Sequence, residues 1–233
     1  MLLISDRYGD RVDPINSFAI GSSDEAKFAF LLAMRERGLI DTDLMRVFEM
    51  IPRSRFVSQR YADLALHDSS LPIACGQTIG APSSLLLMVS ALALEPSHTV
   101  LEIGTGTGFG TAILSRLAAQ VISVERFRAL GIEARMRLRG LSITNTTVIH
   151  GDGTEGVSDF APYDRILVDA SFDAPPLALL GQLLAGGRMV GVRRINGQGR
   201  MATYVMDPVS GIVETLGASI ALPPLISGVS QML

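Results

Sequence analysis

The sequence predicts an α/β fold: a doubly wound, mostly parallel sheet with a helical N-terminal section before it and antiparallel strands at its end. From about residue 83, short runs rich in valine and isoleucine alternate with stretches of helical periodicity. The residues before 83 show helical patterns without such runs. The last two strand-like runs are separated only by a turn. We therefore expect an N-terminal arm with a helical section at 1–82 and a core at 83–233.

The composition excludes several classes of protein. The chain has 233 residues, is 48% hydrophobic and carries a net charge of only −3, which suits a buried core rather than a nucleic-acid coat. The single Cys75 excludes an internal disulfide framework, and the histidines show no spacing typical of metal ligands, so no metal is expected. No signal peptide or apolar run of roughly 18 residues is present, so we expect a cytoplasmic protein that does not cross a membrane.

The N-terminal section contains three expected helices. The first follows a capping-box pair, Ser22 and Glu25, within "SSDEAKFAFLLAMRERG". The second, "DTDLMRVFEMIP", begins after Asp41 and is stopped by Pro52. A short third helix is expected in "SQRYADLAL", and the polar loop "HDSSLPIACGQTIGAP" leads on to the core.

The core alternates strands and helices in order. Strands are expected at 99–103, 120–125, 146–150, 164–170 and 187–194. Helices are expected at about 83–94, 109–118 and 127–139, and after the Pro175–Pro176 pair. The runs 200–206 and 211–220, joined by "DPVSG", form the antiparallel end of the sheet.

A glycine-rich loop follows the first core strand, at the sheet edge where such folds bind ligands. It reads E-x-G-x-G-x-G, with Glu102, Gly104, Gly106 and Gly108. A dinucleotide loop would need a third glycine where this chain has Phe109 or Thr111. No Gly-Lys-Ser/Thr is present either, which excludes a P-loop.

Acidic residues follow the next two strands. Glu125 lies about 20 residues beyond the loop, where a carboxylate can accept hydrogen bonds from both ribose hydroxyls. Asp152, in "HGDG", is placed to reach an adenine edge. Glu102 is expected to act from behind on the cationic half of the ligand. Together these residues predict a nucleoside site without a phosphate cradle, which is the pattern of S-adenosylmethionine, with S-adenosylhomocysteine as product.

Several motifs extend this pattern beyond a fold class. They are "LEIGTGTG", "VISVER", "VIHGDG", "APYDRILVDA" and "LLGQLLAGGRMV", preceded by "IPRSRFVSQRYADLALHDSSLPIACGQTIGAP". Over roughly residues 28–190 the chain resembles the protein-L-isoaspartate O-methyltransferase family. The resemblance implies a Rossmann-like methyltransferase fold that uses S-adenosylmethionine. It also implies methylation of the free α-carboxylate of L-isoaspartyl residues in damaged proteins or peptides, the first step of protein repair.

The motifs and the resemblance assign site residues. The candidate cofactor-binding residues are Gln77, Thr78, Glu102, Gly104, Thr105, Gly106, Gly108, Glu125, Arg126, Asp152, Gly153 and Asp169. The candidate catalytic residues are Gly80, Ala81 and Asp169. A carboxylate is ionised at neutral pH, so the reaction requires positioning and charge balance rather than a general base.

The sequence departs from the family at two positions near the acceptor. Gly80 replaces a serine that helps hold the substrate carboxylate; the backbone N–H of Ala81 remains, and Thr78 or Ser83 is an alternative donor. Asp169 stands where the family has a small neutral or hydroxyl residue. A carboxylate there would repel a carboxylate substrate and would suit an acceptor that must lose a proton. An Asp169 turned away from the site is the other interpretation.

Arginine residues form a third departure from the family pattern, after the fifth core strand, and a separate arginine-rich stretch does not predict a nucleic-acid site. In "GVRRING", Arg193 and Arg194 either bind an anionic group or partly neutralise Asp169, or are exposed residues at a strand end. The arginine-rich stretch around 126–139 lacks interleaved aromatic residues and is expected to be a solvated helix face, so nucleic acid is not an expected partner.

Two alternative functions stay open at this point. The chain is either a divergent methyltransferase of the same family acting on another nucleophile, in a modified peptide, a small molecule or a nucleic acid, or a cofactor-binding protein without turnover. The oligomeric state is not predicted.

Overall fold

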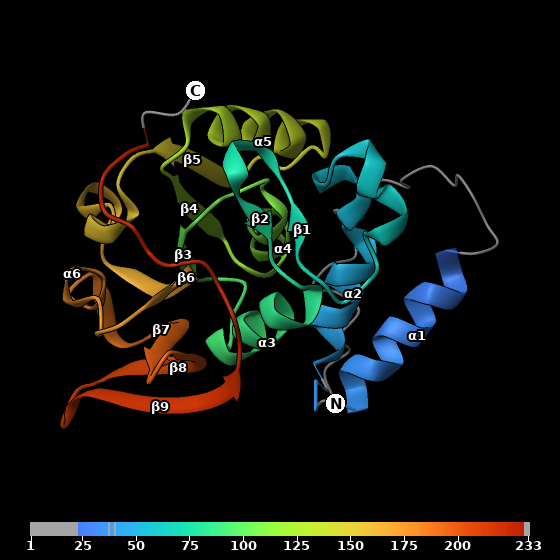
Figure 1. Ribbon diagram of the computed structural model, residues 1–233. Coiled ribbons are helices and arrows are strands. Elements are labelled where there is room, and N and C mark those ends of the chain that lie inside the picture. The colour runs from blue at the N-terminus through green and yellow to red at the C-terminus, as the bar shows by residue number, and fades with distance from the viewer. Residues whose placement is uncertain (1–22, 37, 40, 231–233) are drawn as a thin grey trace.

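A seven-stranded sheet forms the centre of the protein (Figure 1). The computed structural model describes residues 23–36, 38–39 and 41–230. The strand order is β5-β4-β3-β6-β7-β8-β9. Strands β3 to β7 run parallel, and β8 and β9 complete the sheet antiparallel. The strands are β3 Thr99–Ile103, β4 Gln120–Glu125, β5 Thr146–His150, β6 Tyr163–Phe172, β7 Leu183–Ile195, β8 Gln198–Asp207 and β9 Gly211–Ser219. The predicted fold class is confirmed.

The helices agree with the prediction in order and differ in length. They are α1 Ser23–Glu36, α2 Thr42–Met50, α3 Pro82–Leu92, α4 Phe109–Leu117, α5 Arg128–Gly140 and α6 Leu177–Leu180. The expected third N-terminal helix is a 3₁₀ helix, η3 Gln59–Leu64, and the helix after Pro175–Pro176 is a single turn. Asp41 caps α2 by accepting hydrogen bonds from the backbone N–H groups of Asp43 and Leu44, as predicted. The expected cap Ser22 lies outside the described residues.

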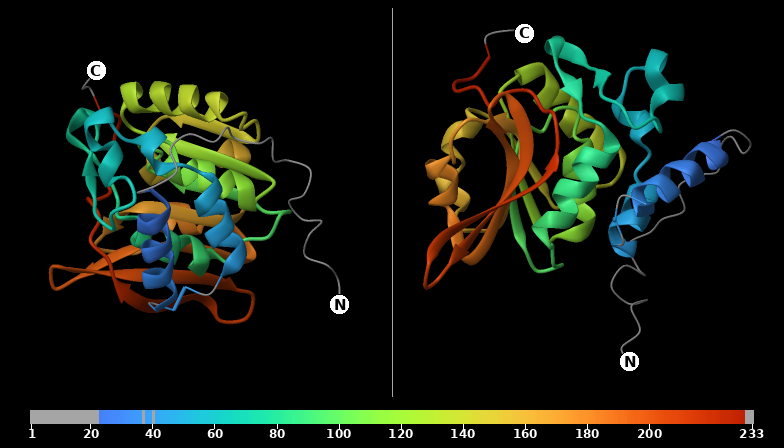
Figure 2. Two further views of the ribbon diagram at one scale, coloured as in Figure 1. Left: turned by 90° about the vertical axis from the view of Figure 1, so that its right-hand side faces the viewer. Right: turned by 60° about the horizontal axis from the view of Figure 1, so that its bottom comes forward.

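Alternation along the strands sends side chains to two apolar layers. Val100 and Val121 face the layer covered by α3, α4 and α5, whereas Leu101 and Ile122 face the opposite layer, which α6 covers. Figure 2 shows this arrangement, with the longer helices on one side of the sheet and α6 on the other. A near-continuous apolar strand is what a parallel sheet covered on both faces requires.

The N-terminal section packs against the outer side of α4 rather than standing apart. Phe48 and Phe56 have ring centroids 6.1 and 5.4 Å from that of Phe109, the first residue of α4. The apolar cluster on this side of the sheet is therefore continuous across residue 82. The division into two parts at that residue stays a prediction.

Two further features place the site. The strand order reverses between β3 and β6, which opens a crevice at the carboxyl edge of the sheet. After β9 the chain returns across that edge as an extended segment, residues 221–230, which we call the C-terminal strap (Figure 1). The backbone of Ser171 fastens the strap: its N–H donates to the carbonyl of Pro223, and its carbonyl accepts from the N–H of Leu225, both at 2.7 Å.

Among the described residues, no helix is both long enough and apolar enough to span a membrane.

Candidate functional site

The glycine loop joins β3 to α4 and needs glycine for two different reasons. Gly104 has a φ of +96°, and a Cβ there would lie 3.4 Å from the carbonyl oxygen of Asp169. Gly110, inside α4, has an ordinary φ, but a Cβ there would lie 2.5 Å from Oε1 of Glu102. The first glycine lets the backbone turn beside β6. The second leaves room for a buried carboxyl group behind the loop.

Glu102 occupies that room, and it is held by hydroxyl groups. Its Oε2 accepts hydrogen bonds from Thr111 at 2.5 Å and from Ser123 at 2.6 Å. Thr105 and Ser123 share a further bond of 2.5 Å. Burial raises the pKa of Glu102 to about 8, more than these hydrogen bonds lower it. Glu102 is buried behind the loop and does not line the pocket, and its predicted action on the cationic half of the cofactor stays a prediction.

Glu125 ends β4 and points into the crevice. Its Oε2 accepts from the backbone N–H of Gly106 at 2.7 Å, and its Oε1 accepts from that of Phe127 at 2.8 Å. Burial raises the pKa of Glu125, and these backbone donors oppose the rise. Both carboxylate oxygens are thus oriented by backbone before any ligand arrives, which suits a diol such as a ribose.

Asp152 accepts hydrogen bonds from the protein on both carboxylate oxygens, and its predicted contact with an adenine edge stays a prediction. Its Oδ1 accepts from the backbone N–H and the hydroxyl of Thr154, at 2.9 and 2.7 Å, and its Oδ2 accepts from the N–H of Gly228 in the C-terminal strap at 2.5 Å. Burial opposes ionisation, but these donors outweigh it and hold the pKa of Asp152 below its usual value. Asp152 does not line the pocket in this structure; its neighbour Gly153 does.

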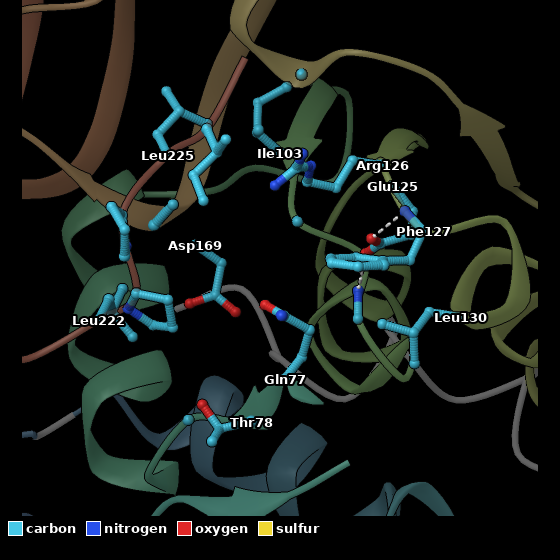
Figure 3. A pocket seen from close by; sticks show the side chains of 18 of the residues that line it. Gln77, Thr78, Ile103, Glu125, Arg126, Phe127, Leu130, Asp169, Leu222 and Leu225 are labelled. Carbon is cyan, nitrogen blue, oxygen red and sulfur yellow. Dashed lines mark hydrogen bonds between the residues drawn. The ribbon is translucent and has the colours of Figure 1, made fainter. Parts of the chain in front are cut away.

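One pocket collects most of the predicted site residues at the carboxyl edge of the sheet (Figure 3). The predicted residues that line it are Gln77, Thr78, Gly80, Gly104, Gly106, Glu125, Arg126, Gly153 and Asp169. The predicted residues that do not line it are Ala81, Glu102, Thr105, Gly108 and Asp152. Ala81 and Gly108 are the residues just before α3 and α4, and Thr105 is buried behind the loop.

Sequence reasoning missed several apolar residues of the pocket. Phe127 and Leu130 follow Glu125 and form one wall, and Ile103 lies at the end of β3 (Figure 3). The opposite wall comes from the strap, residues 221–226. The position of Phe127, two residues after the predicted ribose-binding Glu125, could have indicated an apolar wall of the pocket. No sequence pattern marks the strap as a wall, because its place over the site depends on contacts with residues far away in the chain.

Gly80 and Asp169, the residues that the sequence predicts near the methyl acceptor, both line the pocket, and we call their part of it the acceptor side. Burial and the nearby charge of Glu125 raise the pKa of Asp169 to about 6. No described residue donates a hydrogen bond to the Asp169 carboxyl group, which points into the pocket toward Gln77 (Figure 3). The alternative of an Asp169 turned away from the site is therefore excluded in this structure.

Arg53 holds the loop that carries Gly80. The buried guanidinium donates to the carbonyl oxygens of Ala65 at 2.8 Å, Ser69 at 3.1 Å and Gly80 at 2.9 Å. Burial lowers the pKa of Arg53 to about 10, and the charge of Asp68 opposes the fall. The guanidinium group of Arg53 therefore joins three segments of the chain through their backbone carbonyls. Arg53 is the first arginine of the "PRSRFV" motif.

The paired arginines of β7 do not reach the pocket. Arg193 bonds Glu214, and Arg194 bonds Asp173 at 2.6 and 2.9 Å. Neither residue lines the pocket or faces Asp169. The alternative in which these arginines neutralise Asp169 or bind an anion in the pocket is wrong, because acids on β9 and after β6 hold them at the surface.

Comparisons with known proteins place the chain in a family. A family described as "Protein-L-isoaspartate(D-aspartate) O-methyltransferase (PCMT)" matches residues 25–210. The chain is 48% identical over 162 residues to a protein-L-isoaspartate O-methyltransferase of Azorhizobium caulinodans, covering 70% of this chain and 75% of that one. It is 41% identical over 209 residues to one of Xanthobacter autotrophicus, covering 89% and 94%.

Solved structures show the same fold. One protein-L-isoaspartate O-methyltransferase aligns with a TM-score of 0.75 and 26% identity, covering 85% of this chain and 65% of that longer chain. A putative protein-L-isoaspartate O-methyltransferase of Plasmodium falciparum, solved with S-adenosyl-L-homocysteine, aligns with a TM-score of 0.74 and 20% identity over 85% of this chain.

Proposed function

This chain belongs to the protein-L-isoaspartate(D-aspartate) O-methyltransferase family, and we propose that it methylates the free α-carboxylate of L-isoaspartyl residues in damaged proteins or peptides, using S-adenosylmethionine. The observation that carries the proposal is the pocket at the carboxyl edge of the sheet. It joins the glycine loop and Glu125 on one side to the loop of Gly80 on the other.

The residues of the pocket fit S-adenosylmethionine. Glu125 presents a carboxylate oriented by two backbone N–H groups, and Phe127 and Leu130 supply an apolar wall for a base. The cofactor supplies a methyl group activated on a sulfonium. On this chain, Glu125 would hold the ribose, and the backbone around Gly104 and Gly106 would lie against the rest of the molecule.

Methyl transfer to a carboxylate requires the protein to position the two reactants and does not require a general base. The substrate carboxylate is the nucleophile and needs no base, because its pKa lies far below neutral pH. The protein has to hold that carboxylate in line with the methyl group and exclude water. Thr78, which lines the pocket, is the first proposed donor on the acceptor side. The backbone N–H of Ala81, the residue just before α3 and outside the pocket lining in this structure, is the second. The strap, as the opposite wall, is proposed to exclude water.

Methyl transfer to a matched pair of peptides tests the proposal. Labelled S-adenosylmethionine is incubated with an isoaspartyl peptide and with the same peptide containing ordinary aspartate. We expect label only on the isoaspartyl peptide, and we expect base to release it, as from a methyl ester. No label on either peptide, in a preparation shown to bind the cofactor, would contradict the proposal.

A second candidate function rests on Asp169. An ionised carboxylate beside the acceptor suits an amine or a hydroxyl better than a carboxylate. Transfer of label to such an acceptor, stable to base, would favour a divergent methyltransferase of the same family. A cytoplasmic location stays a prediction.

A further inference from the structure

We propose that the Asp169 carboxyl group carries a proton when substrate binds and donates it in a hydrogen bond to the α-carboxylate of the isoaspartyl residue, in place of the family serine that Gly80 lacks. This inference rests on the proposed function. It makes Asp169 the residue that holds the methyl acceptor.

The position of Asp169 is the first argument. It lies within β6, just after Val168, the last residue of β6 that pairs with β3, and beside the glycine loop. Its side chain enters the pocket that Gly80 and Thr78 also line. A hydroxyl at position 80 and a carboxyl at position 169 would therefore face the same space. Relative to the family pattern, Gly80 removes a hydroxyl donor from that space, and Asp169 adds a carboxyl group to it.

The lack of partners is the second argument. Glu125 and Asp152, the other acids near the crevice, each accept hydrogen bonds from backbone N–H groups. Asp169 accepts none from any residue that the structure describes. The Asp169 side chain is only partly buried and faces the open space of the pocket, so a bound ligand can supply the partner that the protein does not.

The surrounding charges favour the protonated form. Glu125 on β4 is the acid whose charge acts on Asp169, whereas Glu102 on β3, with its pKa raised to about 8, is uncharged where Asp169 titrates. The walls from residues 77–80 and 221–226 carry no charge. Arg126 also lines the pocket, but its charge acts on Glu125 and Asp152. A bound substrate carboxylate adds a further negative charge, and two carboxyl groups in contact share one proton.

The proposal keeps the methyl transfer balanced. The shared proton stays on Asp169 and bonds one oxygen of the substrate carboxylate. The other oxygen attacks the methyl carbon and forms the C–O bond, while the methyl–sulfur bond breaks and its electron pair remains on sulfur. The neutral ester still accepts the hydrogen bond through its carbonyl oxygen.

Proton uptake on peptide binding is the direct test, and it needs no turnover. The isoaspartyl peptide is titrated calorimetrically into the protein saturated with S-adenosylhomocysteine at pH 7.5, in two buffers that differ in ionisation heat. The wild type is expected to take up between about half and one proton per peptide. Asp169→Asn, which keeps the size of the side chain and cannot ionise, is expected to bind the peptide and take up none.

The pH dependence of turnover supplies a second readout. Above its midpoint, kcat/KM of the wild type is expected to fall about tenfold per pH unit, and the midpoint in kcat is expected to be higher, since bound substrate favours the proton. Asp169→Asn removes this decline. Asp169→Ala, which has no donor, lowers kcat/KM about tenfold or more at pH 6, and Gly80→Ser in that background restores part of it.

The outcomes separate this inference from the proposed function. Peptide binding without proton uptake, together with equal affinity in Asp169→Ala, overturns the role of Asp169 and leaves the function intact. No binding of the isoaspartyl peptide by any variant, with S-adenosylhomocysteine bound, overturns both. An Asp169→Asn variant that is inactive at every pH, beside a wild type whose rate rises with pH, would make Asp169 a base for another acceptor.

Discussion

The two halves of the pocket differ in how their carboxyl groups are held. On the cofactor side, Glu125 lies between two backbone N–H groups at 2.7 and 2.8 Å, both from residues near it in the fold. On the acceptor side, Asp169 has no donor among the described residues, and its pKa is raised to about 6 by burial and Glu125. The cofactor side is complete without its ligand. On the acceptor side, the proposed hydrogen-bond partner of the Asp169 carboxyl group is the substrate carboxylate.

The first prediction concerns the frame of the acceptor side and has the largest expected effect. Arg53→Met leaves one buried and two partly buried carbonyl oxygens without this donor, which is expected to lower the free energy of unfolding by about 3 kcal/mol. Urea-induced unfolding of the wild type and the variant measures this change in unfolding free energy. Arg55→Met is the matched control, because Arg55 lies exposed in the same 3₁₀ helix and is expected to change stability by less than about 0.5 kcal/mol. Equal losses in the two variants would show that Arg53 does not organise the loop.

The second prediction concerns the cofactor side. Glu125→Ala removes both carboxylate oxygens and is expected to weaken binding of S-adenosylmethionine about 100-fold. Calorimetric titration measures the Kd. Glu133→Ala serves as control, since Glu133 is exposed and, among the residues that the structure describes, forms an ion pair only with Arg137 on α5. A Kd within about threefold of the wild type in Glu125→Ala would mean that the ribose is bound elsewhere.

The third prediction uses the buried acid behind the glycine loop. Burial raises the pKa of Glu102 to about 8 in the folded protein, above its value in the unfolded chain, so its contribution to stability is present at low pH and is lost as the pH rises to about 8. In Glu102→Gln this loss is absent. We expect the difference in unfolding free energy between pH 5 and pH 8.5 to shrink by more than about 1.4 kcal/mol in the variant. An unchanged difference would place an ionised Glu102 in the native state.

The fourth prediction restores the family hydroxyl and is expected to have the smallest effect. A Cβ at position 80 would lie 3.6 Å from the side chain of Leu222, an ordinary contact, so Gly80→Ser fits without strain. We expect kcat/KM for the isoaspartyl peptide to rise about tenfold at pH 8, while the Kd of the cofactor stays the same. Gly80→Ala separates the hydroxyl from the added methyl group. A gain shared by both variants would assign the effect to packing.

The same contrast explains what could be predicted from sequence. The strands at 99–103, 120–125 and 146–150 have the predicted bounds, because their apolar runs end at glycine or acidic residues that local chemistry makes recognisable. The positions of Gly104, Gly106 and Glu125 follow from those strand ends, so their place together in one pocket was predictable. Asp152 was placed after the correct strand, but its partners Thr154 and Gly228 were not visible.

The acceptor side was less predictable because it is assembled from distant segments. Arg53 bonds a carbonyl 27 residues away, and the N–H of Gly228 reaches a carboxylate 76 residues away. No local pattern marks the C-terminal strap as a wall of the pocket. Arg193 and Arg194 pair with Glu214 on β9 and Asp173 after β6. These pairs depend on how the strands align side by side, which the spacing of residues along the chain does not determine.

A crystal structure of the protein with S-adenosylhomocysteine and an isoaspartyl peptide, grown near pH 6, tests the role of Asp169 most directly. We expect the ribose hydroxyls on Glu125 and the substrate α-carboxylate within about 2.5–2.7 Å of an Asp169 oxygen, a charge-assisted hydrogen bond. A substrate carboxylate held only by Ala81 and Thr78, with Asp169 turned toward solvent or the cofactor, would contradict this role.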